Sequence, residues 1–297
     1  MSPAIMSPAM QAVFDAWSLP VWLSLAILLP ALIYIRGWLA LRKTRREQFN
    51  GWRLTSFLLG LTVLWLAIGS PLDAFADVLL SAHMVEHLLL MSIVPPLLLL
   101  GLPVVPLLRG LPVFTRKAIL GPLLRLTALR HLGHWLVLPI VAWLAMNLTF
   151  LAWHVPAAYD FALEHERWHD FEHICFLVTS LLFWWVVVHP WPSRIHSNDW
   201  RVLLFLISAD LVNTALSAFL AFCNRPVYSY YTTGPNPFHV SPLSDQILGA
   251  VIMWVLGSIV FLVPAILITV RLMSPSRKTS YAGQYQEANP DRSALTL

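Results

Sequence analysis

Apolar residues recur along this chain in long runs that short polar or charged segments separate. There are seven such runs, near residues 18–40, 54–70, 79–106, 135–153, 170–190, 202–222 and 245–271. About 20 predominantly apolar residues are enough for a helix to cross the roughly 30 Å hydrocarbon core of a bilayer. The pattern therefore predicts an all-α, polytopic membrane helix bundle with seven transmembrane helices.

The composition agrees with this pattern and excludes other classes of protein. Hydrophobic residues make up 58% of the chain and charged residues only 11%, against about 25% charged residues in an average soluble protein. So few charges cannot keep that much apolar surface in water. A soluble enzyme, a nucleic-acid-binding module and a disordered tail are therefore excluded.

The basic residues predict the orientation of the bundle. Cytoplasmic loops are enriched in Lys and Arg, and an outside N-terminus places 17 of the 19 bases on the cytoplasmic side. We therefore expect a periplasmic N-terminal tail over 1–17, a transmembrane domain over 18–271 and a flexible cytoplasmic tail over 272–297.

Two local features modify the simple picture of seven straight spans. Pro95 and Pro96 lie in the middle of the third span, where proline removes a backbone donor and predicts a kink or a break. The segment 107–134 alternates bases with leucines, a pattern typical of a helix that lies in the cytoplasmic interface.

Histidine is unusually frequent for a membrane protein. The chain carries 11 histidines beside 15 acids and 19 bases, although hydrocarbon tolerates polar, ionisable groups poorly. In the predicted topology, seven of the 11 histidines and most of the acids fall at the outer face. This asymmetry indicates a polar site at one end of the bundle.

Two of the predicted spans begin with the same motif, HxxEH. The motif residues are His83, Glu86 and His87 in the third span, and His169, Glu172 and His173 in the fifth. Residues i and i+4 lie on one face of a helix, with Cβ atoms about 6 Å apart. Each pair can therefore hold a metal ion through two imidazoles. A single histidine at a helix end is more often a hydrogen-bonded residue than a ligand, but two matching pairs at one face favour ligation.

The neighbouring residues bear on the identity of the metal. Imidazole suits zinc, copper or iron, whereas a thioether shifts the preference toward Cu(I). Met84 lies beside the first motif, and His154 at the outer end of the fourth span is a further candidate ligand. Methionine is also a common packing residue in apolar helices, so the residues favour copper only modestly.

Four acidic residues complete the predicted site. Glu86 and Glu172 belong to the motifs and are expected to orient the ligands or relay protons. Asp245, at the outer start of the seventh span, fits an N-cap of that span or a carboxylate beside the metal. Asp210, in the middle of the sixth span, fits either a proton relay or a polar contact between helices.

These motifs and their flanks resemble one known family, the multi-span CtaG assembly factors of bacterial cytochrome c oxidase, which are distinct from the single-span periplasmic copper chaperones. The resemblance covers roughly 60–280. The residues that carry it are Ser70-Pro71-Leu72, Ser81-Ala82-His83-Met84, Glu86-His87, Trp153-His154-Val155-Pro156, Tyr159-Asp160, His169-Asp170-Phe171-Glu172-His173, Phe183-Trp184-Trp185, Asp245-Gln246 and Met253-Trp254.

The resemblance implies a role in making active haem–copper oxidase, at the formation of a copper centre, without a reaction catalysed by the chain itself. It implies cytochrome c oxidase subunits and periplasmic copper chaperones as partners, and a location in the bacterial inner membrane. Copper would be the metal. The implied copper contacts are His83, Met84, His87, His154, His169 and His173.

Two other functions compete with this interpretation. HxxEH is also the inverted motif of zinc proteases, in which two histidines bind zinc and the glutamate acts as general base. The second alternative is a haem-binding electron-transfer protein with one histidine of the third span and one of the fifth as axial ligands.

Overall fold

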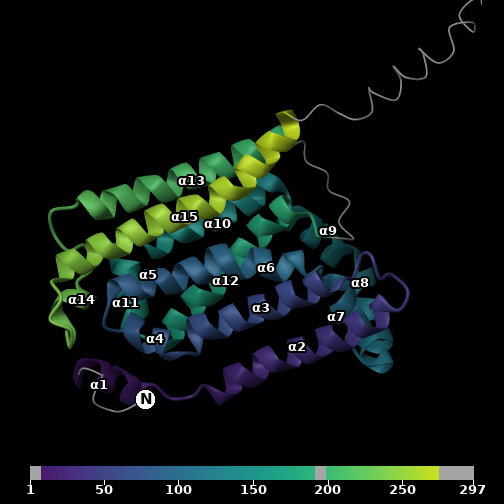
Figure 1. Cartoon of the computed structure of the whole chain (residues 1–297), viewed down its shortest axis with the longest axis horizontal. Coiled ribbons are helices and arrows are strands. Elements are labelled where there is room, and N and C mark those ends of the chain that lie inside the picture. The colour runs from purple at the N-terminus through teal and green to yellow at the C-terminus, as the bar shows by residue number, and fades with distance from the viewer. Residues whose placement is uncertain (1–7, 191–198, 274–297) are drawn as a thin grey trace, which may run out of the picture.

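The computed structural model describes residues 8–190 and 199–273 and shows an all-helical bundle (Figure 1). Six of its helical segments are long and apolar enough to cross a membrane. They are α2 (Val21–Arg42), α3 (Gly51–Ile68) with α4 (Pro71–Ala76), the segment Leu80–Leu100, α12 (Glu166–Val188), α13 (Asp199–Phe222) and α15 (Pro242–Met273).

The seventh span is a bent pair of helices. α9 (Thr127–Leu136) and α10 (Pro139–Trp153) meet at 68° and pass the test for a span only when taken together. The bend falls at Leu138, which is extended because the following Pro139 disfavours helical backbone before it. With this bent pair counted as one span, the prediction of a seven-helix membrane bundle is confirmed.

The third span is interrupted where the proline pair predicts it. α5 (Leu80–Leu88) passes into a π-helical turn, η2 (Leu89–Ile93), and then into α6 (Val94–Leu100). Pro95 has no N–H to offer the carbonyl of Met91, four residues earlier. The indole N–H of Trp184 on α12 donates to that carbonyl instead, at 2.9 Å. This bond joins the two histidine-bearing segments in the middle of the bundle.

The chain then turns back into the bundle, which the sequence did not predict. α7 (Val104–Gly110) packs against α2 rather than lying in the interface. Two glycines allow this contact, since a Cβ on Gly37 would lie 1.8 Å from the Pro106 carbonyl oxygen and one on Gly110 would lie 1.8 Å from the Ile33 carbonyl oxygen. No buried residue is found in the helices that follow α7, which are η3 (Thr115–Leu120), α8 (Gly121–Arg125) and α9. That part of the segment 107–134 lies in the cytoplasmic interface stays a prediction.

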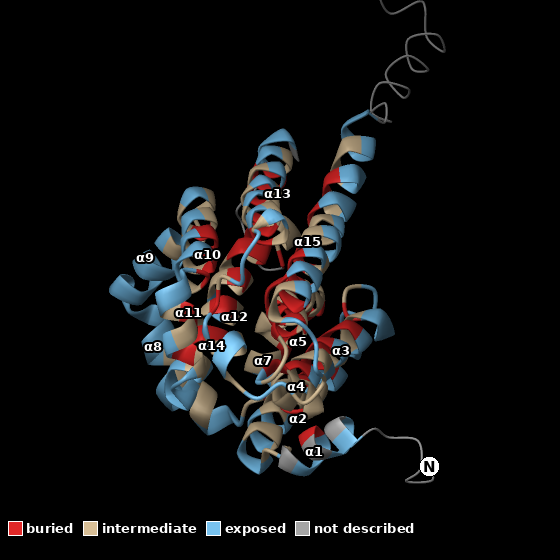
Figure 2. Ribbon diagram, turned by 90° about the vertical axis from the view of Figure 1, so that its left-hand side faces the viewer, coloured by how far each residue is buried: buried red, intermediate tan, exposed pale blue. Residues whose placement is uncertain are grey.

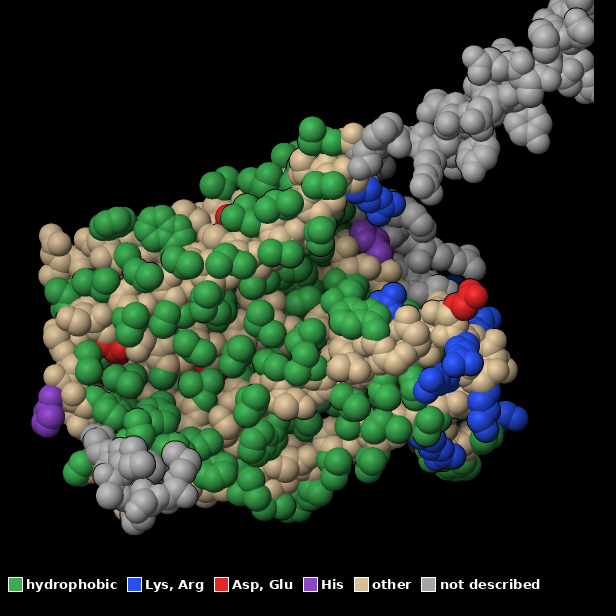
Figure 3. Space-filling model, viewed as in Figure 1, with side chains coloured by type: hydrophobic (Ala, Val, Ile, Leu, Met, Phe, Trp, Pro, Cys, Tyr) green, Lys and Arg blue, Asp and Glu red, His purple; other side chains and the backbone are tan. Residues whose placement is uncertain are grey.

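The two ends of the bundle differ in chemistry. Lys and Arg side chains gather at one end (Figure 3). The short helices α4, α11 (Pro156–Leu163) and α14 (Tyr230–Thr233) lie at the opposite end (Figure 1), which we call the histidine end. Which end faces the cytoplasm stays a prediction.

Burial follows the pattern expected in lipid. Buried residues lie on the helix faces that meet inside the bundle, and exposed residues lie on the faces that point away from it (Figure 2). The exposed residues include many Leu, Ile, Val and Phe. The N-terminal tail predicted over 1–17 contains the helix α1 (Pro8–Ala16). Of the tail predicted over 272–297, residues 274–297 lie outside the described residues.

Candidate metal centre

The structure brings the two HxxEH motifs together at the histidine end. α5 supplies one motif and α12 the other, and the ring centroids of His83 and His169 lie 5.1 Å apart. Glu86 and Glu172 are fully buried. The members of this group are His83, Glu86, His87, His169, Glu172 and His173. Of these only His169 is half-exposed.

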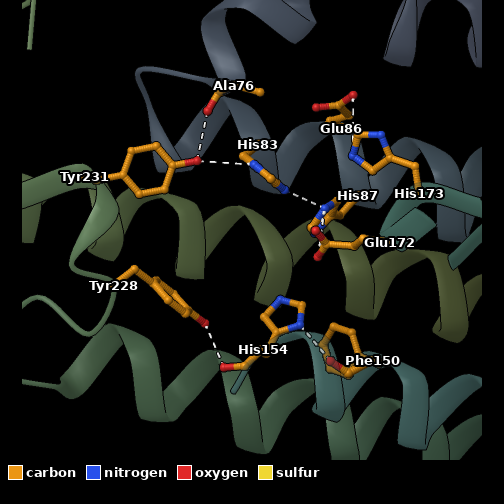
Figure 4. A network of polar contacts seen from close by, with 10 residues as sticks. All are labelled: Ala76, His83, Glu86, His87, Phe150, His154, Glu172, His173, Tyr228 and Tyr231. Carbon is orange, nitrogen blue, oxygen red and sulfur yellow. Dashed lines mark hydrogen bonds and ion pairs between the residues drawn. The ribbon is translucent and has the colours of Figure 1, made fainter. Parts of the chain in front are cut away.

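The loop between α13 and α15 fixes the orientation of His83. The hydroxyl of Tyr231 donates to the carbonyl oxygen of Ala76 at 2.8 Å and therefore accepts from Nδ1–H of His83 at 3.2 Å (Figure 4). Burial raises the pKa of Tyr231 well above its usual value, so the hydroxyl keeps its proton. The Nε2 of His83 is left with a lone pair, and it faces Nε2 of His87 at 2.6 Å.

The glutamate of each motif lies beside a histidine of the other motif. Glu172 of the second motif lies 3.6 Å from Nε2 of His87 in the first, and Glu86 of the first lies 3.7 Å from Nε2 of His173 in the second. Each glutamate thus faces the last histidine of the other motif rather than its own (Figure 4). Both distances are longer than a hydrogen bond.

Many polar atoms of this group are buried without a hydrogen-bond partner among the described residues. They are both carboxylate oxygens of Glu86 and of Glu172, Nδ1 of His87, and Nε2 of His154, His169 and His173. Burying one such group unpaired costs roughly 1–3 kcal/mol in mutational data. A set of this size therefore indicates a polar ligand, and imidazole with carboxylate suits a metal ion.

Two overlapping sets of three residues have the spacing that a metal ion needs. One is His83, His169 and His173; the other is His83, His87 and Glu172. In each set one ligand atom per residue lies within 4.8 Å of the others, so small side-chain movements would bring all three to the usual distance of about 2.0–2.2 Å from one ion. His83 belongs to both sets.

His154 approaches the group from the end of α10. Its Nδ1 donates to the carbonyl of Phe150 at 2.7 Å, and its other ring nitrogen faces His87 and Glu172 (Figure 4). Burial lowers the pKa of His154 to about 4, so the ring is neutral near pH 7 and its Nε2 keeps a lone pair. The hydroxyl of Tyr228 donates to the His154 carbonyl oxygen at 3.2 Å.

A large acidic cavity opens beside the centre. Its volume is about 780 Å³, and His173 is part of its wall. Its carboxylates come from α4, the following turn and the start of α12: Asp73, Asp77, Glu166 and Asp170. Acids that line a cavity raise the local concentration of cations. The surroundings of the centre thus favour the approach of a positive ion.

The remaining predicted residues lie outside the two sets. Met84 packs against α15, where its Cγ would lie 3.1 Å from a Cβ on Gly249. Asp210 accepts from the hydroxyl of Ser258 at 2.8 Å and so joins α13 to α15, which agrees with the interhelical contact among its two predicted roles. Asp210 belongs to neither of the two sets.

Asp245 has a structural contact that differs from the predicted N-cap. α15 begins earlier, at Pro242. The carboxylate of Asp245 instead accepts from the backbone N–H groups of Leu80 at 2.6 Å and Ser81 at 3.2 Å. It therefore pairs with N–H groups at the start of α5 that have no partner within the helix. This contact helps position the helix that carries His83.

The sequence did not predict that tyrosines of the loop between α13 and α15 contact the histidine group. Tyr231 contacts His83 directly, and Tyr159 stacks on Tyr228 at 4.0 Å beneath the same group. The clustering of tyrosines at 228–231 was the available signal. This signal does not show which of the tyrosine rings points into the bundle.

Comparisons with known proteins agree with the resemblance. A model of the family described as cytochrome c oxidase caa3 assembly factor matches residues 32–274. Uncharacterized proteins of Mycobacterium bovis and Mycobacterium tuberculosis are each 29% identical over 275 residues, covering 90% of this chain and 40% of theirs. One of Mycobacterium leprae is 25% identical over 266 residues, 88% of this chain and 39% of its own. The chain thus spans about two fifths of these relatives, and no solved structure matches it.

Proposed function

The chain belongs to the cytochrome c oxidase caa3 assembly factor family, and from this premise we propose that it binds copper at the histidine end and assists formation of an oxidase copper centre. The histidine end would then face the periplasm of a bacterial inner membrane. Oxidase subunits and periplasmic copper chaperones would meet it there. The role is that of an assembly factor rather than an enzyme.

One observation carries the copper proposal: the buried, unpartnered imidazole and carboxylate atoms of the two HxxEH motifs. Imidazole nitrogen is a good ligand for copper, and two buried carboxylates compensate the charge of a divalent ion. No thiolate is needed to close the site. Copper held by imidazole and carboxylate leaves by exchange of single ligands, which suits an ion that is delivered to another protein.

The geometry favours copper over haem. The imidazole rings of His83 and His87 lie 4.1 Å apart and those of His87 and His173 lie 5.6 Å apart. A macrocycle between such rings would have to displace them. The acidic cavity beside His173 is large enough for an organic cofactor, but its carboxylates would repel the propionates of haem.

The positions of the two glutamates also argue against a zinc hydrolase. In that chemistry one glutamate acts as base toward the water on the zinc held by its own motif. Here Glu86 and Glu172 lie in equivalent positions, and each faces the other motif. This symmetry suits a binding site that uses both motifs together.

The test is the double variant His83→Ala with His169→Ala in the full chain. After loading with Cu(II) under oxidising conditions, we expect at least a tenfold loss of bound copper in the purified protein, measured by mass spectrometry, together with loss of active oxidase in cells. The matched control replaces two exposed loop histidines, His165→Ala with His239→Ala, and should change neither. A wild-type protein that binds no copper, or a double variant that keeps both properties, would refute the proposal.

A further inference from the structure

A second, smaller cavity lies on the inner side of the metal centre. Its volume is about 40 Å³, room for only a few water-sized groups since one water needs roughly 10–15 Å³ by this measure. His87 and His154 are part of its wall, so it adjoins the centre. The cavity extends from there toward the middle of the bundle, between η2, α10, α13 and α15.

Thioethers surround this cavity. The cavity is lined by Met91 on η2, Met146 on α10 and Met253 on α15. All three are buried, with exposed fractions of 8%, 4% and 4%. The three sulfur-bearing side chains come from three different helices, so no single helical repeat accounts for their convergence. No acidic side chain lines the cavity.

Two unpartnered imidazole nitrogens complete the donor set. Nε2 of His154 and Nδ1 of His87 are buried without hydrogen-bond partners among the described residues. His154 is 5% exposed, and its Nδ1–H is already used by the carbonyl of Phe150. The free Nε2 is therefore a lone-pair donor rather than a proton donor, on a residue that lines the same cavity as the thioethers.

We propose that this cavity is a second metal site, selective for Cu(I), in which Met91, Met146, Met253 and His154 supply the ligands. The inference rests on the proposed function, because it assigns an oxidation state and a second location to the same cargo. Thioether is a soft ligand that favours Cu(I), and imidazole also binds copper well.

The lower charge of Cu(I) also favours it over a divalent ion in this cavity. The cost of burying an ion in a medium of low dielectric rises with the square of its charge, and this cavity offers only neutral groups. A monovalent ion is therefore tolerated where a divalent ion is not. The centre at the histidine end has two carboxylates and accepts the higher charge, so the two sites differ in the ion they prefer.

The test uses the full chain in detergent, loaded with Cu(I) under anaerobic, reducing conditions. X-ray absorption reports sulfur in the copper coordination shell, and mass spectrometry reports copper per chain. Wild-type protein should show copper–sulfur scattering. The triple variant Met91→Leu, Met146→Leu and Met253→Leu, which nearly conserves volume, should lose that scattering and about one Cu(I) per chain.

Two controls separate this inference from the proposed function. Met84→Leu changes a buried methionine that lies outside the cavity and should leave the spectrum unchanged. His83→Ala with His169→Ala should remove copper from the outer centre but keep the copper–sulfur scattering. If the triple variant does not fold, Met146→Leu and Met253→Leu should each reduce the sulfur contribution singly.

The outcomes divide cleanly. Copper bound by wild-type protein with only nitrogen and oxygen neighbours would overturn the thioether site and leave the proposed function standing. Sulfur scattering that survives the methionine substitutions would overturn it as well. A wild-type protein that binds no copper would overturn both.

Discussion

The hydroxyl of Tyr231 determines which nitrogen of His83 faces the metal centre. Its single proton goes to the Ala76 carbonyl, so it can only accept from His83 Nδ1. Metal-binding histidines commonly donate their second ring nitrogen to such a partner, which fixes the tautomer and the ring orientation. A residue of the loop between α13 and α15 thus orients a candidate ligand on α5.

We therefore expect Tyr231→Phe to weaken copper binding by roughly 10–100-fold, the usual effect of removing a hydrogen bond behind a ligand. The phenyl ring keeps the packing, so the bundle should fold. Copper affinity measured by competition with a chelator checks this. The neighbour Tyr230→Phe is the matched control, and equal affinity in the Tyr231 and Tyr230 variants would contradict the role given to the hydroxyl.

At this scale the sequence predicted the ligands better than their partners. An i,i+4 histidine pair follows from helix geometry, so the motifs at His83 and His169 could be recognised in advance. The exchange of Glu86 and Glu172 between motifs depends on how α5 and α12 face each other. That relation is tertiary, and no spacing along one helix encodes it.

Among the elements, α2 and α7 show how small residues set a contact. The backbones meet where Gly37 and Gly110 have no side chain to separate them. Close approach at such residues is a main source of helix association in membranes, where lipid is as apolar as leucine.

We expect Gly110→Ala to reduce the free energy of unfolding by about 3 kcal/mol, because its Cβ would lie 1.8 Å from a backbone oxygen that cannot rotate away. Denaturation in detergent micelles measures the loss. Gly133→Ala is the control, since a Cβ there meets nothing within 4 Å. A Gly110 variant as stable as the Gly133 variant would show that α7 does not pack as described.

The elements also show why the sequence predicts spans more surely than their ends. Apolar length fixed the six long segments, and Pro95 marked the break in the third span. Whether residues 104–110 continue that span, lie in the interface or return to the bundle depends on a glycine on a different helix, Gly37. Hydropathy carries no information about such a partner.

At the scale of the whole molecule, polar and charged groups are separated between the ends. Bases gather at one end (Figure 3), and the buried carboxylates and imidazoles gather at the other. Buried polar atoms without partners cost stability, and the cation of the proposed function would restore it.

Copper should therefore stabilise the bundle against heat. Binding to the folded state alone adds about 2.7 kcal/mol when the free ion is at 100 times its Kd. A rise in Tm with copper concentration, followed by circular dichroism in detergent, checks this. With Cu(II) as the added ion, the double variant His83→Ala with His169→Ala should show no rise, and a wild-type Tm that does not change with Cu(II) would contradict the expectation.

His83 is common to both metal-binding sets, and its Nδ1 carries a proton held by Tyr231. Only one lone pair, on Nε2, is left for both sets. In the proposed copper site, occupation of one set would therefore exclude occupation of the other, and the five residues of the two sets would form two alternative positions for a single ion. An ion that shifted between them would keep its bond to His83 while it exchanged its other ligands, so the site would hold its cargo continuously yet never in a closed coordination shell.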